Sequence, residues 1–281
     1  MQQLLVKVKY ICNRKLQFEY LKSFNMAYPF GHIEHKVYPN TFLENTSVSI
    51  FTAPWNGQYY DGFDRRFAEA MERDFQLKID PQQFRKSSFM NVEDEEQLVT
   101  YLFYPDKAQV RIARKKYVSF DKTVIPLLSP MKSFVFGVMG QKVIENLLIR
   151  KLNVFPIQGD SEEDVNSKLD NIYGFMFKDE LVKTAKDVEI PENAPWIMSF
   201  RKAVMDDDET EMTIRIGISK AEKDKMYNVI LDSSVKLKEK QNIVEGAIDQ
   251  QLRQLNDKLF DAFHWSVNNS VLSLMQKEVK A

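Results

Sequence analysis

The feature that most constrains this chain is a regular apolar stripe near its C-terminal end. Apolar residues recur there every three or four positions through a polar background, which is the spacing of one face of an α-helix. The run predicts a helix of about 30 residues, roughly 45 Å long at 1.5 Å per residue. Water penalises such a stripe unless another surface covers it. Its residues are Val244, Ile248, Leu252, Leu255, Leu259 and Phe263.

Composition and length indicate a folded chain with one or two cores. Apolar residues make up 44% and charged residues 28% of the 281 residues, which is close to the average of globular proteins. Domains usually contain roughly 100–200 residues. A polar, acidic stretch from Gln158 to Asp164 is the best candidate boundary. We therefore expect an α+β region at 1–157 and a second at 165–281 that ends in the long helix. A single large domain is the alternative.

Several segments have the alternation or the flanking turn residues of antiparallel strands. Pro105 to Ala108 would form the turn of one hairpin, and the acidic run from Asp206 to Glu211 the tip of another. The predicted strands are Leu5 to Ile11, Thr46 to Thr52, Leu98 to Tyr104, Gln109 to Phe120, Ile172 to Phe177, Trp196 to Met205, and Thr213 to Ile218.

Other segments have the period of amphipathic helices. Phe63, Phe67, Met71 and Phe75 recur every fourth residue. Ser129-Pro130 is a helix-start signature, followed by a stripe that continues to Leu148. In an alternative interpretation, Phe134 to Met139 is a short strand that leads into a helix at Gly140. Ser219 and Glu222 form a capping box, which predicts a further helix start.

These elements together predict an α+β fold in which mixed antiparallel hairpins pack with amphipathic helices and a long C-terminal helix. A faint echo between Val110-Arg111-Ile112 and Thr213-Ile214-Arg215-Ile216 hints at a duplicated hairpin-plus-helix unit. Such short similarities also recur by chance.

The charge balance and the cysteine content limit the function. Lysine plus arginine (39) nearly equal aspartate plus glutamate (40), so any binding of nucleic acid requires a local basic patch. A single cysteine, Cys12, excludes an intrachain disulfide framework and fits a reducing compartment. We expect no signal peptide and no membrane helix. The expected location is the cytoplasm or a particle assembled inside the cell.

One local basic cluster stands out, with a tyrosine beside it. Arg111, Arg114, Lys115 and Lys116 precede Tyr117. Basic groups neutralise phosphates and a ring can stack on a base, so these four residues are candidates for contact with a polyanion. A solvated strand end or a subunit contact is the simpler interpretation, because the strand period would place the charges on both faces.

Two groups could be taken for metal sites. His32 and His35 flank Glu34 but lie in a segment rich in Pro and Gly, and no third ligand follows from the spacing. The acidic run at Asp206 to Glu211 lacks the ligand spacing and the glycine of a calcium loop. We expect no metal site. An aromatic group at Trp55, Tyr59, Tyr60 and Phe63 fits a core beneath a turn better than a sugar or peptide platform.

The sequence contains no G-x-S-x-G, no phosphate-binding P-loop and no G-x-G-x-x-G. It therefore suggests no catalytic or cofactor-binding residue, and no cofactor is expected. The leading hypothesis is a non-enzymatic structural or interaction subunit of a larger protein assembly, with identical or different protein subunits as partners. A ring, neck or tail component of a virion is one example. The Val244 to Phe263 stripe is the predicted contact. An enzyme with a loop-built active site and a nucleic-acid-binding module are the alternatives.

Overall fold

The computed structural model describes residues 28–36, 38, 41–54, 63–78, 90–94, 98–190, 192, 194, 196–221, 223 and 225–276. The strand predicted at Leu5 to Ile11, Cys12 and the aromatic residues Trp55, Tyr59 and Tyr60 lie outside these residues.

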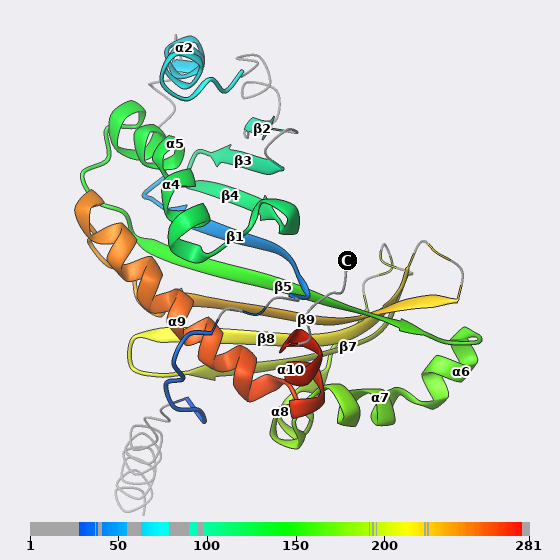
Figure 1. Cartoon of the computed structure of the whole chain (residues 1–281). Coiled ribbons are helices and arrows are strands. Elements are labelled where there is room, and N and C mark those ends of the chain that lie inside the picture. The colour runs from blue at the N-terminus through cyan, green and yellow to red at the C-terminus, as the bar shows by residue number, and fades with distance from the viewer. Residues whose placement is uncertain are drawn as a thin grey trace, which may run out of the picture.

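Within the described part of the chain, nine strands form one antiparallel sheet (Figure 1). Their order is β2-β3-β4-β1-β5-β9-β8-β7-β6, and every neighbouring pair is antiparallel. The predicted α+β class is therefore confirmed. The strands are β1 Leu43–Phe51, β2 Met90–Asp94, β3 Val99–Tyr104, β4 Lys107–Ala113, β5 Asn146–Gln158, β6 Lys186–Asp187, β7 Ile197–Asp206, β8 Thr210–Lys220 and β9 Met226–Leu237.

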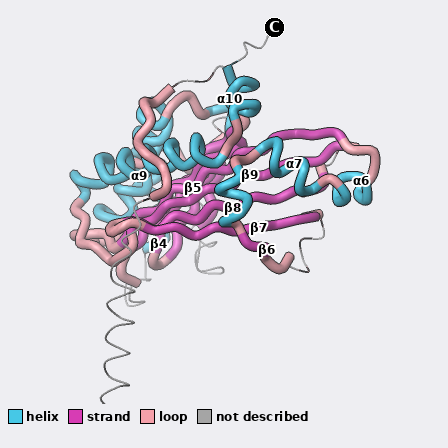
Figure 2. The backbone as a smooth tube through the Cα atoms, turned by 90° about the horizontal axis from the view of Figure 1, so that it is seen from below, coloured by secondary structure: helices cyan, strands magenta, loops and turns pink. Residues whose placement is uncertain are grey.

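The helices pack on one face of this sheet. Figure 2 shows α9, α10 and α7 on the same side of the strands, and α9 runs across them in Figure 1. Tyr101 on β3 donates to the carbonyl of Leu127, which places α4 on this side as well. The helices are α2 Phe63–Phe75, α4 Ile125–Leu127, α5 Ser129–Lys132, α6 Glu162–Ser167, α7 Leu169–Met176, α8 Asp179–Thr184, α9 Ile248–Ser266 and α10 Asn269–Gln276, with shorter turns η2 Arg114–Lys116, η3 Phe120–Val124, η4 Ser133–Val138 and η5 Glu245–Ala247.

The core lies between the sheet and the helices, because alternate residues of each strand point to the same side. One row of directly opposed residues crosses the sheet at its middle, and all but Met205 are buried. Burial of each large apolar side chain contributes roughly 1.5–3 kcal/mol. The row consists of Tyr101, Val110, Val48, Ile149, Val235, Met212 and Met205.

The sheet contains two units with the same order of elements. In the first unit, β1 precedes α2, the three strands β2–β3–β4 and the helical segment from η3 to η4. In the second, β5 precedes α6 to α8, the three strands β7–β8–β9 and α9; the two-residue strand β6 before β7 has no counterpart in the first unit. The first strand of each unit pairs with the last of its three, and β1 and β5 pair antiparallel at the centre. The units are thus related by an approximate two-fold rotation. The echo noted in the sequence joins β4 to β8, which are not equivalent strands.

Several predicted elements are confirmed, among them β1, α2, the β3–β4 hairpin, β7, β8 and the turn that joins β7 to β8. The second strand of the first hairpin, predicted to reach Phe120, ends at Ala113, where the turn η2 follows. The long C-terminal helix is present but shorter than expected, with 19 residues in α9. Val267 at its end is extended, and α10 follows as a separate helix.

Three predicted elements are wrong. The stripe up to Leu148 is not one helix, because Gly140 adopts a left-handed φ of 66° and β5 begins at Asn146; the alternative strand at Phe134 to Met139 is also wrong, since η4 is helical there. Ile172 to Phe177 belongs mainly to α7, where Tyr173 and Phe177 are buried four residues apart. Ser219 lies within β8, paired with Asn228, so the capping box starts no helix.

Candidate functional site

The side of the sheet opposite the helices is the first candidate site. We call it the second face and define it by the outward-pointing residues of β4, β1, β5, β9, β8 and β7. Within the described part of the chain, no helix packs on it. Val204 is 52% exposed there, and Arg150 has a 48% exposed side chain. One row of directly opposed residues across this face consists of Arg111, Ser47, Arg150, Ser234, Thr213 and Val204.

A charged cluster lies at the centre of the second face. Arg150 donates from Nε and Nη2 to the two carboxylate oxygens of Asp232, at 2.6 and 2.9 Å. Arg215 donates from Nη1 to the same carboxylate at 3.3 Å. The Asp232 side chain is only 5% exposed, whereas both guanidinium groups reach solvent. Two arginines on one carboxylate leave a net positive charge, and the bidentate pair fixes the direction of Arg150.

Further basic residues surround this cluster. Lys202 on β7 lies directly opposite Arg215 on β8. Lys236 on β9 pairs with Glu211 at 3.1 Å. At the other border, the Lys107 ammonium lies 4.3 Å from the centre of the Tyr104 ring. Basic side chains therefore extend over the second face from β4 to β7.

The predicted polyanion residues divide between this face and a turn. Arg111 is exposed on β4, opposite Ser47 on β1. Strand β4 ends at Ala113, and the exposed Arg114, Lys115 and Lys116 form the turn η2. The structure brings Arg111 into one row with Arg150, while contact of all four residues with a polyanion stays a prediction.

The predicted contact stripe lies mostly inside the chain. Ile248, Leu252, Leu255 and Leu259 are buried, with α9 packed on β5 and β9. Phe263 is partly buried, and Val244 lies before α9 and is 55% exposed. The four central residues are thus covered by the chain's own sheet. A partner contact through the stripe stays a prediction, and Val244 is its most accessible member.

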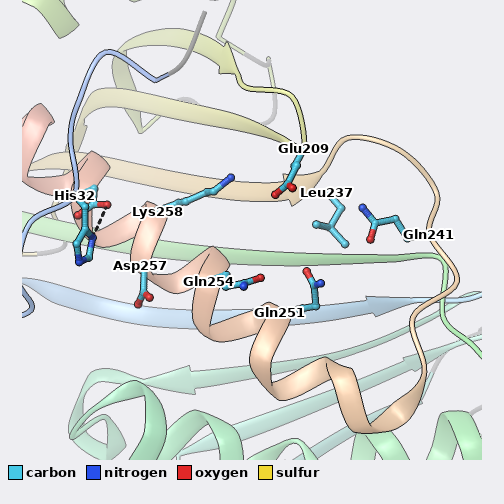
Figure 3. A pocket seen from close by; sticks show the side chains of 9 residues that line it. His32, Glu209, Leu237, Gln241, Gln251, Gln254, Asp257 and Lys258 are labelled. Carbon is cyan, nitrogen blue, oxygen red and sulfur yellow. Dashed lines mark hydrogen bonds and ion pairs between the residues drawn. The ribbon is translucent and has the colours of Figure 1, made fainter. Parts of the chain in front are cut away.

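A groove along the outer side of α9 is the second candidate site (Figure 3). Its volume is about 530 Å³, and it lies between α9, the end of the β7–β8 turn and the segment after β9. Lys258 donates to Asp207 Oδ2 at 2.6 Å and to Thr210 Oγ1 at 3.0 Å at one side of it. The lining is polar: His32, Glu209, Leu237, Gln241, Gln251, Gln254, Asp257, Lys258 and Asp261.

The three histidines of the chain meet beside this groove. Residues 32–36 lie along α9, where His32 contacts Asp261 at 3.3 Å and His35 contacts Asp257 at 3.2 Å. Tyr38 Oη and His264 Nε2 are 3.0 Å apart. Burial, with the nearby Lys178, lowers the pKa of His264 and favours its neutral ring.

Each of these rings faces a separate partner. Among the described residues, no group of three or more His, Cys, Asp or Glu side chains is arranged to hold a metal ion. The contacts of His32 and His35 instead attach the N-terminal segment to α9. Sequence reasoning had no signal for this attachment, because His32 and Asp261 are more than 200 positions apart.

A partly buried lysine beneath α9 was also missed. Lys151 on β5 donates to Asn256 Oδ1 at 2.7 Å, and burial lowers its pKa to about 8. Thr46 and Ser233 lie directly opposite it on the two neighbouring strands. The hydroxyl oxygens of both are buried without a hydrogen-bond partner among the described residues. Recognition of β5 as a strand would have placed Arg150 and Lys151 on opposite faces.

Comparisons with known proteins add little about function. No protein-family model matches the chain, and no curated protein sequence matches it. Among solved structures, a TBP from Methanococcus jannaschii is 13% identical over 78% of this chain and 98% of its own, with a TM-score of 0.28. The di-domain ARO/CYC StfQ from the steffimycin biosynthetic pathway is 8% identical over 66% of this chain and 74% of its own, with a TM-score of 0.14. At TM-scores this low, neither likeness supports a conclusion about the fold or the function of this chain.

Among the described residues, no helix is both long and apolar enough to cross a membrane.

Proposed function

We propose that this chain is a non-enzymatic interaction subunit of a larger assembly and that it contacts its partner through the second face. The observation that supports the proposal is the one-sided packing of the sheet. Among the described residues, the helices that pack on the strands lie on one side, whereas the other side presents arginines, hydroxyls and the exposed Val204. A wide, ordered sheet face provides a rigid surface for a macromolecular partner.

The mixture of side chains on the second face also favours binding over chemistry. Arg150, Arg215 and Asp232 are engaged with one another in a fixed geometry. Arginine is enriched at interfaces because its planar group makes several directed hydrogen bonds. Other protein subunits, identical or different, are the general class of partner. A ring, neck or tail component of a virion remains one example, located in the cytoplasm or in a particle assembled inside the cell.

Site-specific photo-crosslinking in the native cell tests this proposal. p-Benzoylphenylalanine replaces Val204 on the second face or, as a matched control, Val118, which is 68% exposed in the loop between η2 and η3. We expect macromolecular adducts of discrete mass from position 204 and few from position 118. Equal labelling at the two positions, or no adduct from position 204, would show that the second face is not the contact surface.

A further inference from the structure

The second face is locally basic in a chain whose total charge is close to zero. Its basic side chains come from separate strands: Lys107 and Arg111 on β4, Arg150 on β5, Arg215 on β8 and Lys202 on β7. Among the described acidic residues of this face, Asp232 is held by two arginines, Glu211 is matched by Lys236, and Asp206, directly opposite Glu211, is matched by Lys238. The excess charge therefore results from the fold, which gathers these side chains on one side.

Four of these charges, Arg111, Arg150, Arg215 and Lys202, lie along an oblique line that crosses the strands, in which Arg215 and Lys202 are two residues away from the row of Arg111 and Arg150. Arg111 and Arg150 are separated by β1, and Arg150 and Arg215 by β9, so the steps are about 10 Å at 4.8 Å per strand. From β4 to β7 the line spans five strand spacings, or about 24 Å. One strand of a nucleic acid in helical form places about seven phosphates over that length, at 3.4 Å each. The spacing suits a linear polyanion better than a single small anion.

Other groups on the same line suit a phosphate backbone. Ser234, partly exposed and directly opposite Arg150, carries a hydroxyl donor of the kind that binds phosphate oxygens, whereas Ser47 and Thr213 in the same row are buried. Arg150 uses Nε and Nη2 for Asp232, and a guanidinium has further N–H donors that can reach a ligand. Partly exposed rings, Phe51 and Tyr104 at one border and Phe200 at the other, provide surfaces on which bases stack.

We propose that the second face binds a nucleic-acid strand through its phosphates, with Arg111, Arg150 and Lys202 as the principal contacts. The inference rests on the proposed function, because it uses the same contact face; within an assembly of protein subunits, it names nucleic acid as the component that this face binds. Binding is electrostatic and tolerant of sequence, so it weakens steeply as salt rises.

Fluorescence anisotropy with labelled 20-nucleotide probes tests the inference. The probes are single-stranded DNA, single-stranded RNA and duplex DNA, each at 50 and 150 mM salt. We expect the full chain to bind at least one probe with a Kd on the order of 1–100 µM at 150 mM salt. The double variant Arg111→Glu/Lys202→Glu should weaken binding by about tenfold or more and reduce the salt slope by about 2.

The matched control is Lys122→Glu/Lys142→Glu, which makes the same charge change at exposed positions outside the second face. It should keep the affinity within about twofold, because distant charges are screened at this salt. If the Glu variant does not fold, Arg111→Gln/Lys202→Gln replaces it, with an expected loss of about fivefold. No binding of any probe at 50 mM salt, or equal losses in both double variants, overturns the inference. Protein adducts from position 204 together with such a result would leave the proposed function standing.

Discussion

Lys151 shows how a single residue can oppose the stability of the fold around it. Its amine lies between the sheet and α9, where it donates to Asn256 and where burial lowers its pKa to about 8. The unfolded chain holds its proton more tightly, with an ordinary lysine pKa near 10.5. Below pH 8 the charged Lys151 therefore lowers the free energy of unfolding. This destabilisation disappears as the pH rises from about 8 to 10.5.

We predict that Lys151→Met stabilises the protein at pH 7 by about 1–3 kcal/mol, less the loss of the hydrogen bond to Asn256. The gain over the wild type should shrink as the pH approaches 10.5. Urea unfolding at several pH values measures both effects. Lys142→Met, at an exposed position, serves as the control and should show no such trend. A variant that is less stable than the wild type throughout this range contradicts the prediction.

Asp207, in the turn between β7 and β8, stabilises the fold, in contrast to Lys151. Its Oδ1 accepts from the backbone N–H groups of Glu209 and Thr210, and its Oδ2 accepts from Lys258. Burial opposes ionisation, but these hydrogen bonds prevail and lower the pKa of Asp207 below 3.8. The resulting stability is present above pH 3.8 and is lost as the pH falls through the folded pKa.

We predict that Asp207→Ala destabilises the protein by about 1–3 kcal/mol at pH 7, because several donors lose one acceptor. The difference from the wild type should narrow in acid, as the carboxylate takes up a proton. Thermal unfolding at pH 7 and near pH 3 measures it. Asp208→Ala, one residue further at an exposed position, should change stability by less than about 0.5 kcal/mol. Equal effects of the two substitutions would refute a special role for Asp207.

At the scale of the element, α9 connects the two units of the sheet. Its buried leucines rest on β5 and β9, while Arg253 pairs with Asp121 and Asp249 with Lys132 in the first unit. We predict that Leu255→Ala destabilises the protein by about 2–5 kcal/mol, since the core cannot fully close around the cavity. Gln254→Ala, on the exposed side of α9, is the control. If Leu255→Ala leaves stability intact but changes the assembly state, the stripe acts as a partner contact.

Elements with a strict period could be predicted from the sequence, and elements with two apolar faces could not. In β8, the apolar residues Ile214, Ile216 and Ile218 alternate with more polar ones, so this strand could be predicted from the sequence alone. In β5, Leu147 and Leu148 point to opposite sides of the sheet, so the apolar run resembles a helical stripe. This run forms a strand and not a helix because it lies at the centre of the sheet, between β1 and β9.

The candidate site depends on pairings that a single sequence does not contain. Arg111 was recognised from its basic neighbours, yet those neighbours form a turn. Its direct neighbours across the strands are Ser47 and Thr100, and Arg150 lies one strand beyond Ser47. Asp232 and Arg215 belong to strands β9 and β8, and the register brings them opposite each other. Register follows from the whole hydrophobic pattern of a sheet and from its turns. The local spacing of basic residues therefore identified Arg111, but not the row of residues that continues from it across the strands.

At the scale of the whole molecule, the two units meet along β1 and β5. The connection between the units, from Gly140 to Glu145, is bonded to both: Ile144 exchanges backbone hydrogen bonds with Ile243 of the second unit, while the N–H group of Glu145 donates to the carbonyl of Phe51 in the first. The ladder inside the second unit pairs Leu148–Gln158 with Met226–Lys236. It is longer than the ladder between the units, which joins Leu43–Phe51 to Asn146–Asn153.

We predict that the chain tolerates a cut between Gln141 and Lys142 better than a cut between Gly159 and Asp160. The first cut leaves β5 with β9, so the fragments have only the shorter β1–β5 ladder and the contacts of α9 to restore. The second cut separates β5 from β9 and exposes a longer open edge, which favours aggregation. Co-expression of each fragment pair, followed by the yield and the melting temperature of the complex, measures the difference. The intact chain gives the reference for both. A more stable complex from the second cut would assign β5 to the first unit, as the boundary predicted at Gln158 to Asp164 requires.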